Sequence, residues 1–190
     1  MARYGREHKE ATRQRIVESA GNRFKQSGVD ASGIATLMAE VGLTNGAFYA
    51  HFESKDDLVA TVVAEQVRAQ VERIAALPAG RAGVEEFIRD YLSVEHRDNP
   101  ASGCPSAALL DEIARFTDAT RQGYTDGAGA IIDEIATRLS PRNPAGARAR
   151  SIGLFTLLVG TLQLSRAVAD QELSLEVLAS GIENARAFLR

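Results

Sequence analysis

Apolar residues recur along most of the chain at intervals of three and four, which is the spacing of a helix with one buried face. The first such stretch, about 9–27, puts Ile16, Ala20 and Phe24 on one face, and Gly28 follows as a helix stop. No stretch shows the alternation of apolar and polar residues that is typical of a half-buried strand. The pattern therefore predicts an all-α protein.

Two short helices are predicted after the first one. They lie at about 33–40, with Ser32 as a candidate cap, and at about 45–52, with Thr44 as the cap. Gly42 separates them and permits a sharp turn. Two short helices joined in this way indicate a helix-turn-helix.

A longer linking helix is predicted at about 55–76, because Ser54 to Asp57 form a variant of the capping box. Later helices are separated by breaks rich in Gly and Pro, and they are predicted at about 82–97, 105–116, 118–139, 147–169 and 174–189. This layout predicts a three-helix N-terminal domain of residues 1–54. The linking helix then joins it to a helical bundle, and together they form a second domain of residues 55–190.

The second of these short helices, at about 45–52, has two unlike faces. Phe48 and Phe52 lie one turn apart and can pack inward, while the opposite face carries only the small residues Gly46, Ala47 and Ala50. Small residues let a helix approach a groove closely, as a DNA recognition helix must.

With these features in place, the run from Gly28 to Leu58 resembles the DNA-binding domain of the TetR family of bacterial transcription regulators. The residues that carry the resemblance are Gly28-Val29, Gly42-Leu43-Thr44, Gly46, Phe48-Tyr49, His51-Phe52 and Ser54-Lys55-x-x-Leu58. The likeness covers about residues 9–60. The rest of the chain fits the family's ligand-binding and dimerisation domain in layout.

The resemblance implies eight positions that face DNA. Tyr49, His51 and Lys55 would contact phosphates, and the helix starts at Ser32 and Thr44 would do the same. Positions that would meet base edges are Asn45, Gly46 and Ala47. For His51 the alternative is a surface histidine packed on its neighbours.

The charge pattern agrees with a nucleic-acid interface at the N-terminal end. Residues 1–27 hold seven basic and three acidic side chains, a net charge of +4, so the rest of the chain carries −7 of the total of −3. A basic end on an acidic body suits a module that binds a polyanion. A solvated basic helix is the alternative.

For the body, the resemblance implies a homodimer formed through the last two helices and a ligand pocket between the middle helices. Packing within one chain is the alternative for the last two helices. Candidate pocket residues are Phe87, Tyr91, Cys104, Leu110, Ile113, Phe116, Tyr124 and Leu157. Such a set suits a small and mostly apolar effector, and the lack of a charge cluster in these helices argues against a strongly anionic one.

Cys104 is the only cysteine, which excludes an intrachain disulfide and a cysteine-based metal site. The segment 103–114 resembles one in a branch of the TetR family in which some members use a cysteine here to sense electrophiles or oxidants. The start of a helix favours the reactive thiolate, and Arg97 and Arg115 could approach it. A small buried cysteine that only packs is the alternative.

Taken together, the sequence predicts a ligand-responsive DNA-binding regulator, with a repressor as the family expectation. Its partners would be a double-stranded operator, a small-molecule effector and a second copy of the chain. No cofactor, metal site or membrane span is predicted, and the location would be cytoplasmic. The alternatives are a small helical enzyme, with the acid pairs Asp111-Glu112 and Asp133-Glu134, and an architectural DNA binder without effector.

Overall fold

The computed structural model describes residues 2–190, and side chains from residue 7 onward. The described residues form helices and no strand, so the all-α prediction is confirmed. The helices are α1 Ala2–Ser27, α2 Ile34–Glu40, η1 Asn45–Ala50, α3 Lys55–Ala76, α4 Arg81–Tyr91, α5 Val94–Asp98, η2 Pro100–Ser102, α6 Pro105–Ile113, α7 Asp118–Leu139, α8 Pro144–Ala167, α9 Gln171–Ala185 and η3 Arg186–Leu189. None of these described helices is long and apolar enough to cross a membrane.

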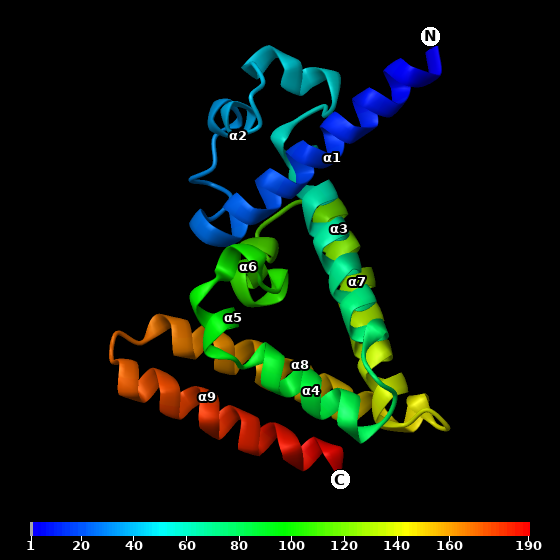
Figure 1. Ribbon diagram of the computed structural model, residues 1–190, viewed down its shortest axis with the longest axis vertical. Coiled ribbons are helices and arrows are strands. Elements are labelled where there is room, and N and C mark those ends of the chain that lie inside the picture. Colours follow the sequence, from blue (N-terminus) through cyan, green and yellow to red (C-terminus); the bar gives the residue numbers. More distant parts are fainter. Residues whose placement is uncertain (1) are drawn as a thin grey trace.

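The helices outline a triangle (Figure 1). At its apex lie α1, α2 and η1, which form the helix-turn-helix unit. From there α3 runs down one side, packed along α7, to a base made of α4, α8 and α9. The short helix α6 lies between α1 and the base, so α6 and α3 both connect the apex to the body.

Three predicted details are wrong. The helix expected at 82–97 is broken after Tyr91, because Ser93 accepts a hydrogen bond from the His96 N–H (3.1 Å) and starts α5 anew. The cap of α2 is Gly33, while the Ser32 hydroxyl instead donates to the Gly28 carbonyl at 2.7 Å.

The third misprediction concerns the segment after the turn, which is a 3₁₀ helix. Its hydrogen bonds run from the Ala47 N–H to the Thr44 carbonyl and from the His51 N–H to the Phe48 carbonyl. The segment has only six helical residues, so burial of Phe48 and Phe52 fixes its position more than helical hydrogen bonding does.

The apex and the body share one apolar core. In the apex Phe24, Leu37 and Phe48 are fully or almost fully buried, and the cluster continues along α3 into the body. Burying a large apolar side chain contributes about 1.5–3 kcal/mol. α3 therefore contributes side chains to the core of both parts.

Candidate nucleic-acid interface and ligand cavity

The turn and η1 present an exposed edge on a firmly anchored base. Gly42 adopts a φ of 74°, which favours glycine, and the Leu43 N–H returns to the Met38 carbonyl at 2.9 Å. Beneath the edge the rings of Phe48 and Phe52 lie 5.5 Å apart and are buried. Thr44 and Asn45 are exposed, and the Thr44 side chain makes no capping hydrogen bond. Their polar atoms therefore face solvent.

Nothing in the conformation or packing of the chain requires position 46 to be a glycine. Its φ is not positive, and a Cβ atom added there would meet nothing within 4 Å. A glycine in a helix costs about 1 kcal/mol relative to alanine. The effect of the glycine is that no side chain projects from the outer surface of η1 at this position.

Tyr49 projects from the same edge. Its side chain is 65 % exposed, while its ring stands edge-on to Phe48 with centroids 5.3 Å apart. The packing fixes the ring and leaves the hydroxyl in solvent. Ala47, two residues earlier, is half-buried.

His51 lies at the end of η1 beside the basic first helix. Its Nδ1 atom is buried and has no hydrogen-bond partner among the described residues. Desolvation lowers the pKa of His51, and the positive charges of Lys9 and Arg13 lower it further. A phosphate placed here would oppose these effects, because an anion favours the charged imidazole.

Two of the eight candidate DNA contacts are turned toward the loop between α1 and α2. The Lys55 ammonium donates to the Val29 carbonyl at 2.6 Å, and Ser32 is completely buried. In this structure both stabilise the loop that precedes α2. Six of the eight candidates therefore lie in η1 or at its two ends, and they are Thr44, Asn45, Gly46, Ala47, Tyr49 and His51. Ser32 and Lys55 instead contact the loop between α1 and α2.

A cavity of about 590 Å³ lies between α3, α4 and the segment 93–104. Its lining residues are Gln70, Arg73, Ile74, Leu77, Phe87, Asp90, Tyr91, Ser93, Glu95, His96, Ser102, Gly103 and Cys104. Of the eight candidate pocket residues, Phe87, Tyr91 and Cys104 are among them.

The other five candidates lie outside this lining. Leu110 is exposed, and Ile113 is part of the buried core. Phe116 and Leu157 pack against that core, and the Tyr124 hydroxyl donates to Ser106 Oγ at 3.0 Å. Apolar periodicity alone does not separate core residues from cavity residues, because both lie on the inner faces of helices.

Tyr91 carries a buried hydroxyl that makes no hydrogen bond to an oxygen or nitrogen of the described residues. Burial raises the pKa of Tyr91 well above its ordinary value, and interaction with the Cys104 thiol raises it further, so the hydroxyl is neutral. Its ring stands edge-on to both Phe87 (5.5 Å) and His96 (4.9 Å). A donor without a strong partner in a cavity wall can serve a ligand.

His96 fixes the cavity wall near Cys104. The Cys104 N–H donates to Nε2 of His96 at 3.0 Å, and Nδ1 lies 2.8 Å from the Tyr91 carbonyl. A carbonyl only accepts and an N–H only donates, so these partners assign the neutral ring with its proton on Nδ1. Burial lowers the pKa of His96, consistent with that state.

Cys104 is buried at the start of α6 and does not have the neighbours expected for it. Arg97 instead bonds Asp98 and Ser174, and Arg115 bonds Asp111. The basic groups that interact electrostatically with Cys104 are Lys25 and Arg166. The sequence did not indicate either, because they belong to α1 and α8.

The acid pairs considered for catalysis have structural partners. Asp111 pairs with Arg115, and the Glu112 carboxylate accepts the Val29 N–H at 2.8 Å. Asp133 pairs with Arg148, and Glu134 with Arg138. Within the described residues no group of three or more His, Cys, Asp or Glu side chains could hold a metal ion.

Comparison with known proteins agrees with this geometry. Residues 16–62 match the family model of bacterial regulatory proteins, tetR family. They span the last part of α1, the turn, η1 and the start of α3. The N-terminal unit is thus similar to the domain that this family model describes.

Two curated relatives match over part of their length. The HTH-type transcriptional repressor Rv1474c of Mycobacterium tuberculosis is 31% identical over 93 residues, which are 49% of this chain and 47% of the relative. The HTH-type transcriptional regulator AcrR of Shigella flexneri is 36% identical over 62 residues, or 33% of this chain and 29% of AcrR. The matches therefore span less than half of either relative.

Solved structures extend the likeness to the whole fold. The reduced form of E. coli NemR superposes with a TM-score of 0.79 at 17% identity, covering 93% of this chain and 96% of NemR. A TetR-family regulator from Agrobacterium tumefaciens gives 0.75 at 19% identity, covering 93% and 98%. The segment that matches the family model is thus joined to a body with the fold of these proteins, and both curated relatives are named as transcription regulators.

Proposed function

We propose that the protein is a dimeric transcription regulator whose TetR-type domain binds an operator and whose cavity binds a small effector that changes this affinity. The observation that carries the proposal is the exposed edge from Thr44 to Tyr49, held on buried Phe48 within a domain that matches the family model. Such a protein acts where the DNA is, in the cytoplasm.

At the operator, Asn45, Gly46 and Ala47 would meet base edges, and Tyr49 and Thr44 would donate to phosphates. The bare Gly46 surface supports this assignment, because it lets the backbone approach the groove. Ser32 and Lys55 would act by holding the loop before α2, and His51 would gain its proton on contact with a phosphate.

The dimer would form through α8 and α9. Exposed residues with apolar or small side chains follow one another at every fourth position of α8, and they are Ile152, Thr156, Gly160 and Leu164. Leu173 and Leu175 are exposed on α9. An exposed stripe of apolar and small residues along a helix suits an interaction surface, and a two-fold dimer presents two recognition elements to two half-sites.

The signal would pass through two contacts between α1 and the body. Lys25 donates to the Gly103 carbonyl at 3.1 Å, and the Val29 N–H donates to Glu112 at 2.8 Å. Gly103 and Cys104 line the cavity, so a ligand that displaces this wall pulls on the end of α1. Two states with different positions of the apex would then differ in operator affinity.

The effector would be small, and an electrophile that reacts with Cys104 is one candidate. Repression is proposed from the name of the M. tuberculosis relative, a transcriptional repressor. In that arrangement the effector releases the dimer from its operator.

Operator binding is tested by fluorescence anisotropy on DNA from upstream of the protein's own gene. Tyr49→Phe should weaken binding about tenfold, because it removes one hydrogen bond to a charged phosphate. Gly46→Leu should weaken it more by filling the bare surface, and both variants should keep the wild-type melting temperature. Tyr124→Phe removes a hydroxyl bonded to Ser106 and serves as the matched control with unchanged DNA binding.

Equal affinity of the wild type and both η1 variants would refute the proposed interface. Compounds that raise the melting temperature are then added to the protein–DNA complex. Release of the DNA supports the regulator, whereas unchanged DNA affinity favours an architectural DNA binder.

A further inference from the structure

Three basic side chains from three different helices gather around the inner end of the cavity. They are Lys25 of α1, Arg73 of α3 and Arg166 of α8. Arg73 lines the cavity, Lys25 bonds the carbonyl of the lining residue Gly103, and Arg166 bonds the carbonyl of the lining residue His96 at 2.5 Å. All three positive charges lower the pKa of His96, whose side chain lines the same cavity.

In the part of the chain that the structure describes, none of these three charges has a carboxylate within ion-pair distance. Lys25 bonds only the Gly103 carbonyl, and Arg73 bonds the Gln70 amide oxygen at 2.6 Å. Arg166 bonds two backbone carbonyls. Most other arginines with described side chains are paired with acids, so the lack of acids here is a property of this place.

The acids near the cavity do not neutralise this group. Asp90 and Glu95 also line the cavity and are exposed, as Arg73 is, but among the described residues neither acid forms an ion pair with Lys25, Arg73 or Arg166. Asp98 attracts Arg166 from a distance but is exposed and bonded to Arg97. Lys25 is buried and Arg166 half-buried, while Arg73 is exposed at the cavity wall. Burying a cation without a partner is unfavourable, and an anion beside it reduces the penalty.

The other cavity walls add a hydrogen-bond donor and an apolar surface. Tyr91 lines the same cavity, and its buried hydroxyl interacts with the Cys104 thiol, a weak partner, but makes no hydrogen bond to an oxygen or nitrogen of the described residues. Ile74, Leu77 and Phe87 supply apolar surface beside it. A volume of about 590 Å³ suits a molecule of two or three fused rings.

We infer that the cavity takes an organic acid, with its carboxylate toward Arg73 and the Tyr91 hydroxyl and a flat apolar body against Ile74, Leu77 and Phe87. Lys25 and Arg166 lie behind the cavity wall, and their charges make the electrostatic potential in the cavity more positive. The inference rests on the proposed function only in taking this cavity as the effector site. The sequence had predicted an effector without strong negative charge, because the middle helices carry no charge cluster. The inference differs because the three cations come from α1, α3 and α8.

The test is direct binding to the full-length protein, without DNA, by isothermal titration calorimetry. The probes are 2-naphthoate and 2-naphthamide, which share one shape and differ in charge. Naphthoate should bind at least tenfold more tightly, since a hydrogen bond to a charged group is stronger than one to a neutral group.

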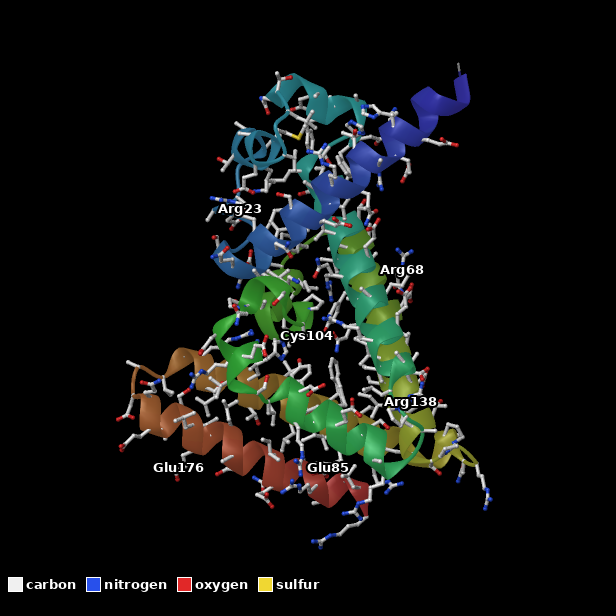
Figure 2. The ribbon with its side chains drawn as sticks, in the orientation of Figure 1. Arg23, Arg68, Glu85, Cys104, Arg138 and Glu176 are labelled. Carbon is white, nitrogen blue, oxygen red and sulfur yellow. The ribbon has the colours of Figure 1, made fainter. Side chains whose placement is uncertain are left out.

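Variants locate the charge. Arg73→Gln and Tyr91→Phe should each weaken naphthoate binding about tenfold and leave naphthamide binding unchanged. Arg68→Gln is the matched control on the same helix, because Arg68 pairs with Glu72 and projects from the outer side of α3, away from Cys104 (Figure 2).

Naphthamide binding as tightly as naphthoate overturns the inference, and so does a lack of binding of both probes at about 1 mM. Loss of the naphthoate preference in Arg68→Gln but not in Arg73→Gln also overturns it, since the charge would then lie elsewhere. Because no DNA is present, failure of operator binding would refute the regulator and leave the preference for the acid standing.

Discussion

Lys25 offers a sharp test of how the apex is joined to the body. It is only 8 % exposed, and burial together with Arg73 and Arg166 lowers its pKa from 10.5 to about 8. This difference corresponds to a cost of about 3 kcal/mol for the charged form at neutral pH. The Lys25→Met variant keeps the length of the side chain, removes the charge and leaves the Gly103 carbonyl without its donor, a loss of about 1 kcal/mol.

The direction in which stability changes with pH follows from proton linkage. Between about pH 8 and 10.5 the unfolded chain keeps the proton that folded Lys25 has released, so the wild-type protein gains stability as the pH rises. The penalty is fully present below about pH 8. Lys25→Met should therefore be more stable than the wild type by about 2 kcal/mol at pH 7, and this advantage should fall by about 3 kcal/mol by pH 10.5.

The assay is urea unfolding followed by circular dichroism at a series of pH values, with the difference between variant and wild type taken at each pH. Lys9→Met, at an exposed position of the same helix, is the matched control and should show no such change. Cys104 interacts with Lys25, so the pair is also compared in a Cys104→Ser background. Parallel profiles of the wild type and Lys25→Met would refute the buried charge.

Two further predictions concern the body. Thr156→Arg should convert the dimer to a monomer in analytical ultracentrifugation, because it puts a charge into the exposed stripe of α8; Thr137→Arg, at an exposed threonine of α7 that bonds its helix in the same way, should stay dimeric. A dimer that persists in Thr156→Arg would place the interface elsewhere. Cys104→Ser should bind the operator normally but no longer be released by an electrophile such as N-ethylmaleimide, and release that continues in this variant would leave Cys104 as a packing residue.

The fold was predictable from the sequence because local signals agree with one another in the apex. Ser54 caps α3 as expected, its hydroxyl accepting the Asp57 N–H at 3.1 Å, and Gly42 makes the turn. The break between α4 and α5 was missed because Ser93 has a side chain that is common within helices as well as at their starts.

The candidate site was less predictable, because its charged residues are widely separated along the sequence. Lys25, Arg73 and Arg166 lie near the same cavity but are far apart in sequence, so no local pattern could reveal them. One signal did exist in the first helix. Val17, Gly21 and Lys25 follow one another at four-residue intervals beside the apolar stripe, and all three are buried. A lysine on the buried side of a helix is a candidate for a functional charge.

The bare surface at Gly46 has a consequence for how such a protein can change. Thr44, Asn45 and Gly46 are exposed, and apart from the adjoining residues and the backbone of η1 no described atom lies within 4 Å of the position that a Gly46 Cβ would occupy. Substitutions there change the exposed surface while Phe48 and Phe52 continue to hold the segment. With the proposed interface, target preference would be separated from folding stability, and new operator specificities could be selected, in nature or in a library of variants at these three positions, without compensating changes in the core.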